Sequence, residues 1–383
     1  MTAEYHRLGD YIREVNVRNR ELNVTRLVGL TIDKAFIPSV ANVIGTDLSN
    51  YKVIRREQFA CSLMQVSRDG KMPVAMFNDE KAIMSPAYPM FEVVDKTKLL
   101  PQYLMMWFSR SEFDREASYY AVGGVRGSLT WEDFCNMQLP VPSIERQREI
   151  VLEYETLTRR IRLNNQMIEK LEATAQALYR HTFVAGIDKQ NLPDGWHLAN
   201  LGDFGEVITG KTPSTLDESN FGDYMPFVTI PDMHDGVFVI KTERTLSKKG
   251  ATLQANKTIP KNSVCVSCIG TSGLVVITTQ DCQTNQQINT IVPSKEYSLE
   301  YIYITCCGLE KIISEYGMGG AVLNNLNKSD FENLRVIKPS DNVMKRFHEQ
   351  VSSVFHSMYL KQQENLKLTE LQSLLLAKMG QTN

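Results

Sequence analysis

The 383-residue chain contains no long apolar run. Its longest uncharged stretch, Asn262 to Gln280, is rich in Ser, Thr and Gly, whereas a membrane-spanning helix needs about 20 mostly apolar residues. We therefore expect two strands separated by glycines there, and no membrane span. The N-terminal segment is polar, unlike a secretory signal. Seven scattered cysteines, an odd number, then favour free thiols and a cytoplasmic location.

Motifs for catalysis are missing as well. An adenine methyltransferase would need an Asn/Asp-Pro-Pro-aromatic motif and a Gly-rich cofactor loop, and the sequence has neither. A restriction nuclease would need an acidic-x-Lys element after a Pro-Asp, but Pro231-Asp232 has no such partner downstream. Among only six histidines no Ser-His-Asp order stands out. The chain is therefore expected to be non-catalytic, with an autonomous enzyme as the alternative.

Metal and nucleotide sites have only weak support. Cys265-x-x-Cys268, followed by Cys282, could bind zinc, but the surrounding strand is apolar, and buried thiols are common in such strands. The loop around Lys211 has the Gly-Lys-Thr of a phosphate loop without its spaced glycines. We expect no metal and no cofactor on this chain.

The net charge is also small, at −2, so the composition alone does not indicate a nucleic-acid-binding protein. A neutral total can still contain local basic surfaces. The length predicts two or three domains.

What the sequence does contain is a long internal repeat. A segment that begins with Gly123-Gly124 has a second copy that begins with Gly319-Gly320. Both copies contain Leu and Asp-Phe and end in Pro-Ser. Leu129 corresponds to Leu326 at an offset of 197 residues, and the offset drifts by only a few residues along the chain. Chance likeness of strand-and-turn sequence is the alternative. The repeat predicts two related globular domains.

Each copy of this segment is followed by a region with heptad spacing. The first, Ile144 to about Phe183, is free of Pro and Gly, and the second runs from about Asn342 to Met379. Forty helical residues extend roughly 60 Å. Asn164 and Lys361 interrupt equivalent core positions, so each helix is expected to need a partner. The predicted interface positions are Ile150, Leu157, Ile161, Ile168, Leu171 and Leu178 in the first helix, and Phe347, Val354, Met358, Leu368 and Leu375 in the second.

The expected fold is therefore α+β: two related α/β domains separated by two long helices that form an antiparallel coiled coil with approximate two-fold symmetry. The expected divisions are residues 1–142, 143–190, 191–339 and 340–383. Such symmetry matches two half-sites on a DNA duplex. A plain dimerisation coiled coil with unrelated head domains is the alternative.

Polar loop residues are the candidates for DNA contacts. Asn and Gln can hydrogen-bond an adenine edge, Arg can bind guanine or phosphate, and Ser and Thr can contact bases or phosphates. Turn capping accounts for many such residues, and drift of unconstrained loops would also make the two copies differ. The candidates are Arg55, Arg56, Arg68, Lys71, Tyr88, Arg126 and Ser128 in the first domain, and Lys211, Thr212, Ser272, Asn285, Gln286, Asn324 and Asn325 in the second.

The chain resembles the specificity subunit of type I restriction-modification enzymes over nearly its whole length. The resemblance rests on LGDFGEVITGKTPS from Leu201, IGTSGLVVIT from Ile269, TNQQINTIVP from Thr284, and the repeated segment leading into IERQREIV from Ile144. The second copy departs from the family in VMKRFHEQV, because the family more often has a Gln at the place held in the first copy by Gln147.

The resemblance implies that each domain recognises one half of a split double-stranded DNA sequence. It also implies that the helices set the spacer and bind two modification subunits, which carry S-adenosylmethionine and methylate adenine N6. Two restriction subunits that use ATP and Mg²⁺ join in some systems. A coiled-coil protein adaptor without sequence-specific DNA binding is the alternative function.

Overall fold

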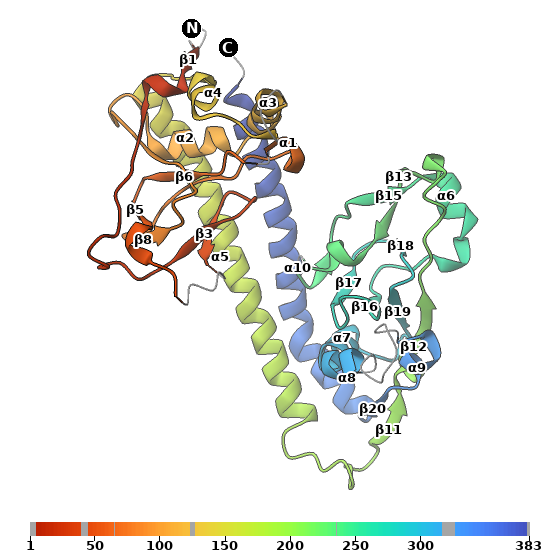
Figure 1. Cartoon of the computed structure of the whole chain (residues 1–383). Coiled ribbons are helices and arrows are strands. Elements are labelled where there is room, and N and C mark those ends of the chain that lie inside the picture. Colours follow the sequence, from red (N-terminus) through yellow and green to blue (C-terminus); the bar gives the residue numbers. More distant parts are fainter. Residues whose placement is uncertain are drawn as a thin grey trace. The chain divides into compact units, whose positions relative to one another are not determined.

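The structure is a computed structural model, and it describes residues 5–39, 45–64, 66–122, 127–234, 236–315 and 326–380 (Figure 1). The chain forms two compact units. Unit 1 comprises Met1–Arg160 and Lys367–Asn383, and unit 2 comprises Ile161–Leu366. Each unit therefore contains one globular domain together with part of both long helices, α5 (Ile144–Phe183) and α10 (Asp341–Lys378).

Unit 1 is built on a four-stranded antiparallel sheet of order β2-β9-β6-β7, with three two-stranded pairs β1-β10, β3-β4 and β5-β8. Its core is aromatic: Phe59 stacks on Phe91, and Phe108 and Phe134 pack against the same rings. The strands are β1 (Tyr5–Arg7), β2 (Ile12–Glu14), β3 (Val28–Leu30), β4 (Phe36–Pro38), β5 (Lys52–Arg55), β6 (Phe59–Cys61), β7 (Val74–Met76), β8 (Lys81–Met84), β9 (Met90–Val93) and β10 (Gln138–Pro140). The helices, besides α5 and α10, are α1 (Val66–Asp69), α2 (Pro101–Phe108), α3 (Ser111–Ala121) and α4 (Trp131–Asn136).

Unit 2 has a five-stranded sheet of order β12-β19-β16-β17-β14, a three-stranded sheet β15-β13-β18 and the pair β11-β20. Two central strands, VCVS at residues 264–267 and VVIT at residues 275–278, are buried at every position and hence on both faces. The strands are β11 (His197–Asn200), β12 (Gly205–Thr209), β13 (Phe221–Val228), β14 (Phe238–Val239), β15 (Arg244–Leu246), β16 (Val264–Ser267), β17 (Val275–Thr278), β18 (Gln283–Thr284), β19 (Ile288–Pro293) and β20 (Arg335–Lys338). Its other helices are α6 (Lys248–Leu253), α7 (Leu299–Cys307), α8 (Glu310–Glu315) and α9 (Lys328–Glu332).

The two units repeat one scaffold around equivalent buried side chains. Tyr103 and Tyr301 are both buried, and their hydroxyls donate to the carbonyls of Pro140 and Ile337 in strands β10 and β20. Phe134 and Phe331 are fully buried in the short helices α4 and α9. The prediction of two related α/β domains with two long helices is confirmed at the level of the fold.

The long helices begin and end within one or two residues of the predicted limits, and they pack together. In unit 2 they are antiparallel: the Phe183 ring, late in α5, lies 5.0 Å from the Phe347 ring, early in α10. Nearer the other end of the unit, Asn164 donates to Asn365. In unit 1, the side chain of Gln372 donates to the Thr158 hydroxyl at 2.6 Å.

A buried glutamine ties the start of α5 to domain 1. Gln147 is 0% exposed, accepts from the Leu100 N–H at 2.9 Å, and donates to the carbonyls of Lys98 and Pro142. The equivalent residue in α10 is Met344, which is also buried and packs in the core of unit 2. The first copy of the scaffold therefore holds its long helix through the hydrogen bonds of Gln147, and the second holds its helix through apolar packing of Met344.

The cysteines that raised the possibility of zinc lie in two different cores. Cys268 packs with the large core of unit 2, while Cys265 and Cys282 pack in a smaller one. Burial raises the pKa of the Cys265 thiol to about 12, and that thiol accepts from the Thr290 hydroxyl. Within the described ranges, no group of three or more His, Cys, Asp or Glu could hold a metal ion. Nor does any described helix have the length and apolar character to cross a membrane.

Candidate nucleic-acid interface

Three polar loops converge in the second domain. The Lys211 N–H donates to the Thr284 carbonyl at 2.9 Å, and the Thr212 hydroxyl donates to Gln286 Oε1 at 2.6 Å. A third loop, Gly270 to Gly273, joins them because the Gln287 side chain donates to the Ile269 carbonyl. Five predicted residues thus belong to one loop cluster: Lys211, Thr212, Ser272, Asn285 and Gln286.

Glycine at position 210 makes the close approach of these loops possible. A Cβ there would lie 2.1 Å from the Asn285 carbonyl oxygen and 2.2 Å from the Thr284 hydroxyl. Any side chain would push the Lys211 loop away from the Asn285 loop.

Exposure separates the candidates in this cluster. Lys211 and Gln286 are exposed, so their polar groups face solvent. Asn285 is only 8% exposed, and its side chain bonds both the N–H and the side-chain oxygen of Gln287. This is the turn-capping alternative that the sequence left open for Asn285. Ser272 is half-buried, and its hydroxyl has no hydrogen-bond partner among the described residues.

The Gly-rich segment of the second domain rejoins the described chain beside this cluster. The Leu326 N–H donates to the Cys268 carbonyl, and the Asn289 side chain donates to the Leu326 carbonyl. Asn324 and Asn325 lie outside the described residues.

The first domain has a corresponding junction. The Leu129 N–H donates to the Leu63 carbonyl at 2.9 Å, and the Ser67 hydroxyl donates to the Gly127 carbonyl. Ser128 is therefore next to the segment that carries α1 and Arg68. Arg126 lies outside the described residues.

Arg68 and Lys71 are exposed cations with acidic neighbours. Arg68 bonds both carboxylate oxygens of Asp69, at 2.6 and 3.0 Å, and Lys71 lies 3.4 Å from Asp33. Their side chains are 64% and 52% exposed. Exposed ion pairs of this kind contribute only about 0–1 kcal/mol, so both cations remain available to a phosphate.

A second basic group lies on the β5–β8 pair of the first domain. Arg55 and Arg56 are exposed, and Arg55 stands directly opposite Lys81 in the antiparallel register. Like charges in that position destabilise a sheet, which an anion bound between them would relieve. Tyr88 is half-buried against a small core, and its carbonyl accepts from the Lys52 ammonium, whose pKa burial lowers.

Three further basic residues of the first domain are not among the candidates from the sequence: Arg18, Arg20 and Lys81. Arg18 and Arg20 both donate to Asn50, one to its carbonyl and one to its side chain. The short VRNR run at 17–20 in a nearly neutral chain was the available signal. Lys81 carried no such signal, because only strand pairing brings it opposite Arg55.

Some of the residues predicted to form the helix–helix interface lie in unit 1 and the others lie in unit 2. In unit 2, Ile168, Phe347 and Met358 are buried, and Leu171, Leu178 and Val354 pack against the same core; Ile161 is half-buried. In unit 1, Ile150 packs against the core and Leu368 is half-buried. Leu157 and Leu375 line a groove of about 510 Å³ between α5 and α10.

That groove is apolar and open. Its lining includes Leu152, Leu371 and Leu374, which are 66%, 48% and 58% exposed. Glu153 and Lys378 also line it. Exposed apolar surface that is contiguous and bordered by charged groups is typical of a protein-binding site.

The fold and these sites define a protein of two related domains, each with a cluster of polar or basic loops, joined through paired helices. The model of the type I restriction modification DNA specificity domain matches residues 65–173 and 193–370. The chain is 30% identical over 352 residues to the specificity subunit of the type I restriction enzyme HindI from Haemophilus influenzae, covering 73% of this chain and 77% of that protein. It is 27% identical over 158 residues to the MjaIX specificity subunit from Methanocaldococcus jannaschii, covering 40% and 36%.

A solved structure shares the fold. The type I restriction-modification S subunit from M. genitalium aligns over 98% of this chain and 95% of its own, with a TM-score of 0.59 and 12% identity. The match to the family model and the identity to the HindI subunit show that the chain belongs to the type I restriction-modification specificity subunits. It is a non-catalytic component that recognises DNA.

Proposed function

We propose that the chain recognises a bipartite double-stranded DNA sequence, with residues 1–142 reading one half and residues 191–339 the other. The observation that carries the proposal is a contrast between core and loops. Buried residues recur in both copies, as Tyr103 and Tyr301 do, while the exposed polar residues of the loops differ: they include Arg68 and Lys71 in the first domain and Lys211 and Gln286 in the second. Different loops on one scaffold suit two different half-sites.

The long helices have two roles in this proposal. They fix the unspecified spacer between the half-sites, and they bind two adenine-N6 methyltransferase subunits that carry S-adenosylmethionine. The apolar groove lined by Leu152, Leu371 and Leu374 supports a docking role. Restriction subunits that use ATP and Mg²⁺ complete the complex where the system includes them.

The experiment is a binding measurement on the chain purified with its methyltransferase partner. A randomised DNA pool should enrich one split sequence, and affinity for it should fall steeply with salt because phosphate contacts release counterions. Mapping methylated adenines in the host genome should return the same sequence. Salt-insensitive assembly without enrichment of any sequence would instead establish the adaptor alternative.

A further inference from the structure

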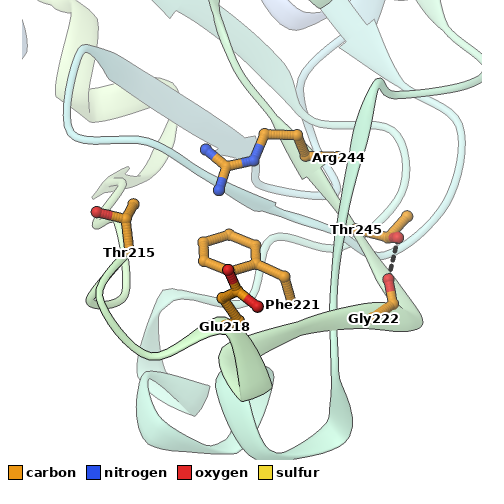
Figure 2. Close-up of a pocket in the computed structure, with 6 residues that line it drawn as sticks. All are labelled: Thr215, Glu218, Phe221, Gly222, Arg244 and Thr245. Carbon is orange, nitrogen blue, oxygen red and sulfur yellow. Dashed lines mark hydrogen bonds between the residues drawn. The ribbon is translucent and has the colours of Figure 1, made fainter.

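A cleft in the second domain lies outside the loop cluster described above. It has a volume of about 470 Å³ and is lined by Thr215, Glu218, Phe221, Gly222, Arg244 and Thr245 (Figure 2). Arg244 and Thr245 come from β15, Phe221 and Gly222 from β13, and Glu218 from the short turn before β13. Thr215 continues the loop that carries Lys211 and Thr212, so the cleft adjoins a segment that is a candidate for DNA contact.

The cleft holds an arginine side chain in one orientation. The guanidinium of Arg244 lies over the Phe221 ring, 4.1 Å from its centroid (Figure 2). The ring is itself supported from the core, where it contacts the buried Phe227. A guanidinium stacked on a fixed ring keeps its N–H groups directed outward in one plane, and such preorganisation lowers the entropy lost on binding.

An irregular strand shapes the opening. Phe221 and Met225 both pair with Leu246, so the residues between them leave the regular ladder of β13. Gly222 lies so close to Ser247, the residue that follows β15, that a Cβ on Gly222 would lie 3.1 Å from the Ser247 Cβ. Bulges of this kind redirect side chains and are frequent next to functional sites.

Arg244 and Glu218 carry charges that are not paired with an opposite charge among the described residues of the domain. Neither Arg244 nor Glu218 has an ion-pair partner within 4.0 Å among the described residues. The neighbouring carboxylate does: Asp217 lies 2.7 Å from the Lys249 ammonium, and hydrogen bonds from Lys249 and Ser219 lower the pKa of Asp217 to about 2. The cleft therefore presents the N–H donors of the Arg244 guanidinium and the carboxylate oxygens of Glu218 to solvent.

This combination selects among possible ligands. A phosphate would meet Arg244 but be repelled by the Glu218 carboxylate. The major-groove edge of a G·C pair offers what the cleft lacks: guanine O6 and N7 accept from an arginine fork, and cytosine N4 donates to a carboxylate. We propose that Arg244, held on Phe221, reads a guanine in the half-site of the second domain, with Glu218 accepting from the paired cytosine.

This inference rests on the proposed function, and its test separates the two. The complex with the methyltransferase partner is offered randomised DNA, and the base preference at each position is counted. For Arg244→Ala we expect the preference for G·C to fall about 5- to 150-fold at one position of one half-site, with the other positions unchanged. Arg244→Lys should relax the same position, because an ammonium cannot make the coplanar pair of bonds. Glu218→Gln should weaken the preference at that position too.

Lys248→Ala is the matched control, since Lys248 is exposed on the adjacent α6; it should leave every base preference intact. A wild-type complex that enriches no sequence would refute the proposed function itself. If the wild-type complex enriches one sequence and the Arg244→Ala variant keeps every base preference, only the assignment of Arg244 to a guanine is refuted. Uniform weakening on all sequences, with a smaller salt dependence, would also overturn it, because Arg244 would then contact phosphate alone.

Discussion

Asn164 and Asn365 meet between the long helices within unit 2: Asn164 Nδ2 donates to Asn365 Oδ1 at 3.0 Å, and Asn365 Nδ2 donates to Asn165 Oδ1 at 2.6 Å. Asn164 is 3% exposed. A polar pair in an apolar helix seam contributes less stability than packed leucines but specifies which register the helices adopt. The interruption of the heptad seam at Asn164 is therefore satisfied by a partner on the opposite helix.

Breaking this pair should be costly only when one partner is left. Asn164→Ala should destabilise the chain by about 1–3 kcal/mol, because the amide of Asn365 loses its buried partner. The double variant Asn164→Leu/Asn365→Leu should recover that loss. Urea unfolding followed by circular dichroism measures both, with Gln166→Ala as the exposed control on the same helix. Equal stability of Asn164→Ala and the wild type would show that the Asn164–Asn365 hydrogen bond does not stabilise the helix pair.

Gln147 and Met344 provide a reciprocal experiment at equivalent positions. Gln147→Met removes three hydrogen bonds of a fully buried side chain and leaves the half-buried Leu100 N–H without its partner, so we expect a loss of about 2–4 kcal/mol. Met344→Gln should also destabilise, by about 1–3 kcal/mol, because it buries an amide in an apolar core. Thermal unfolding of both variants is the measurement. An unchanged unfolding temperature in either variant would contradict the expected requirement for a polar side chain at position 147 and an apolar one at position 344.

Acid should weaken the Asp217–Lys249 contact in a defined pH window. The pKa of Asp217 is lowered in the folded state, so this carboxylate favours folding above its ordinary pKa near 3.8, and the contribution is lost as the pH falls toward about 2. In Lys249→Ala the pKa of Asp217 should rise toward its ordinary value. A carboxyl NMR titration of the side chain reports this directly, and an unchanged midpoint in the variant would show that Lys249 is not the cause.

The open groove in unit 1 should be required for partner binding. Leu374→Glu places a charge among Leu152, Leu371 and Leu375, and we expect it to weaken association with the methyltransferase subunit at least tenfold. Because Leu374 is 58% exposed, folding should be preserved. Leu216→Glu is the control, since Leu216 is 97% exposed in a loop of unit 2. Co-purification and calorimetric titration with the partner distinguish the two variants; equal binding by both would exclude the groove as the docking surface.

The sequence predicted the scaffold well because periodic burial determines it. Apolar residues that recur at helical spacing, and buried aromatics that recur after about 197 residues, are visible in one sequence. The role of each loop residue was less predictable. Asn285 and Gln286 are adjacent and chemically alike, yet one caps its own turn and the other is exposed.

Arg244 was not predicted at all. Its environment depends on a strand irregularity that places Phe221 beneath its guanidinium. Nothing in the spacing of the two residues along the chain indicates that contact. Asn324, Asn325 and Arg126 fall outside the described residues, and their proposed DNA contacts remain predictions.

The most direct test of two independently reading domains is an exchange of one of them. Residues 1–142 are replaced by the first domain of a relative with a different recognition sequence, and methylated adenines are mapped in a host that expresses the hybrid with its methyltransferase. We predict a sequence in which one half is new, while the other half and the spacer length are those of the wild type. A hybrid that methylates a site changed in both halves would contradict independent recognition by the two domains.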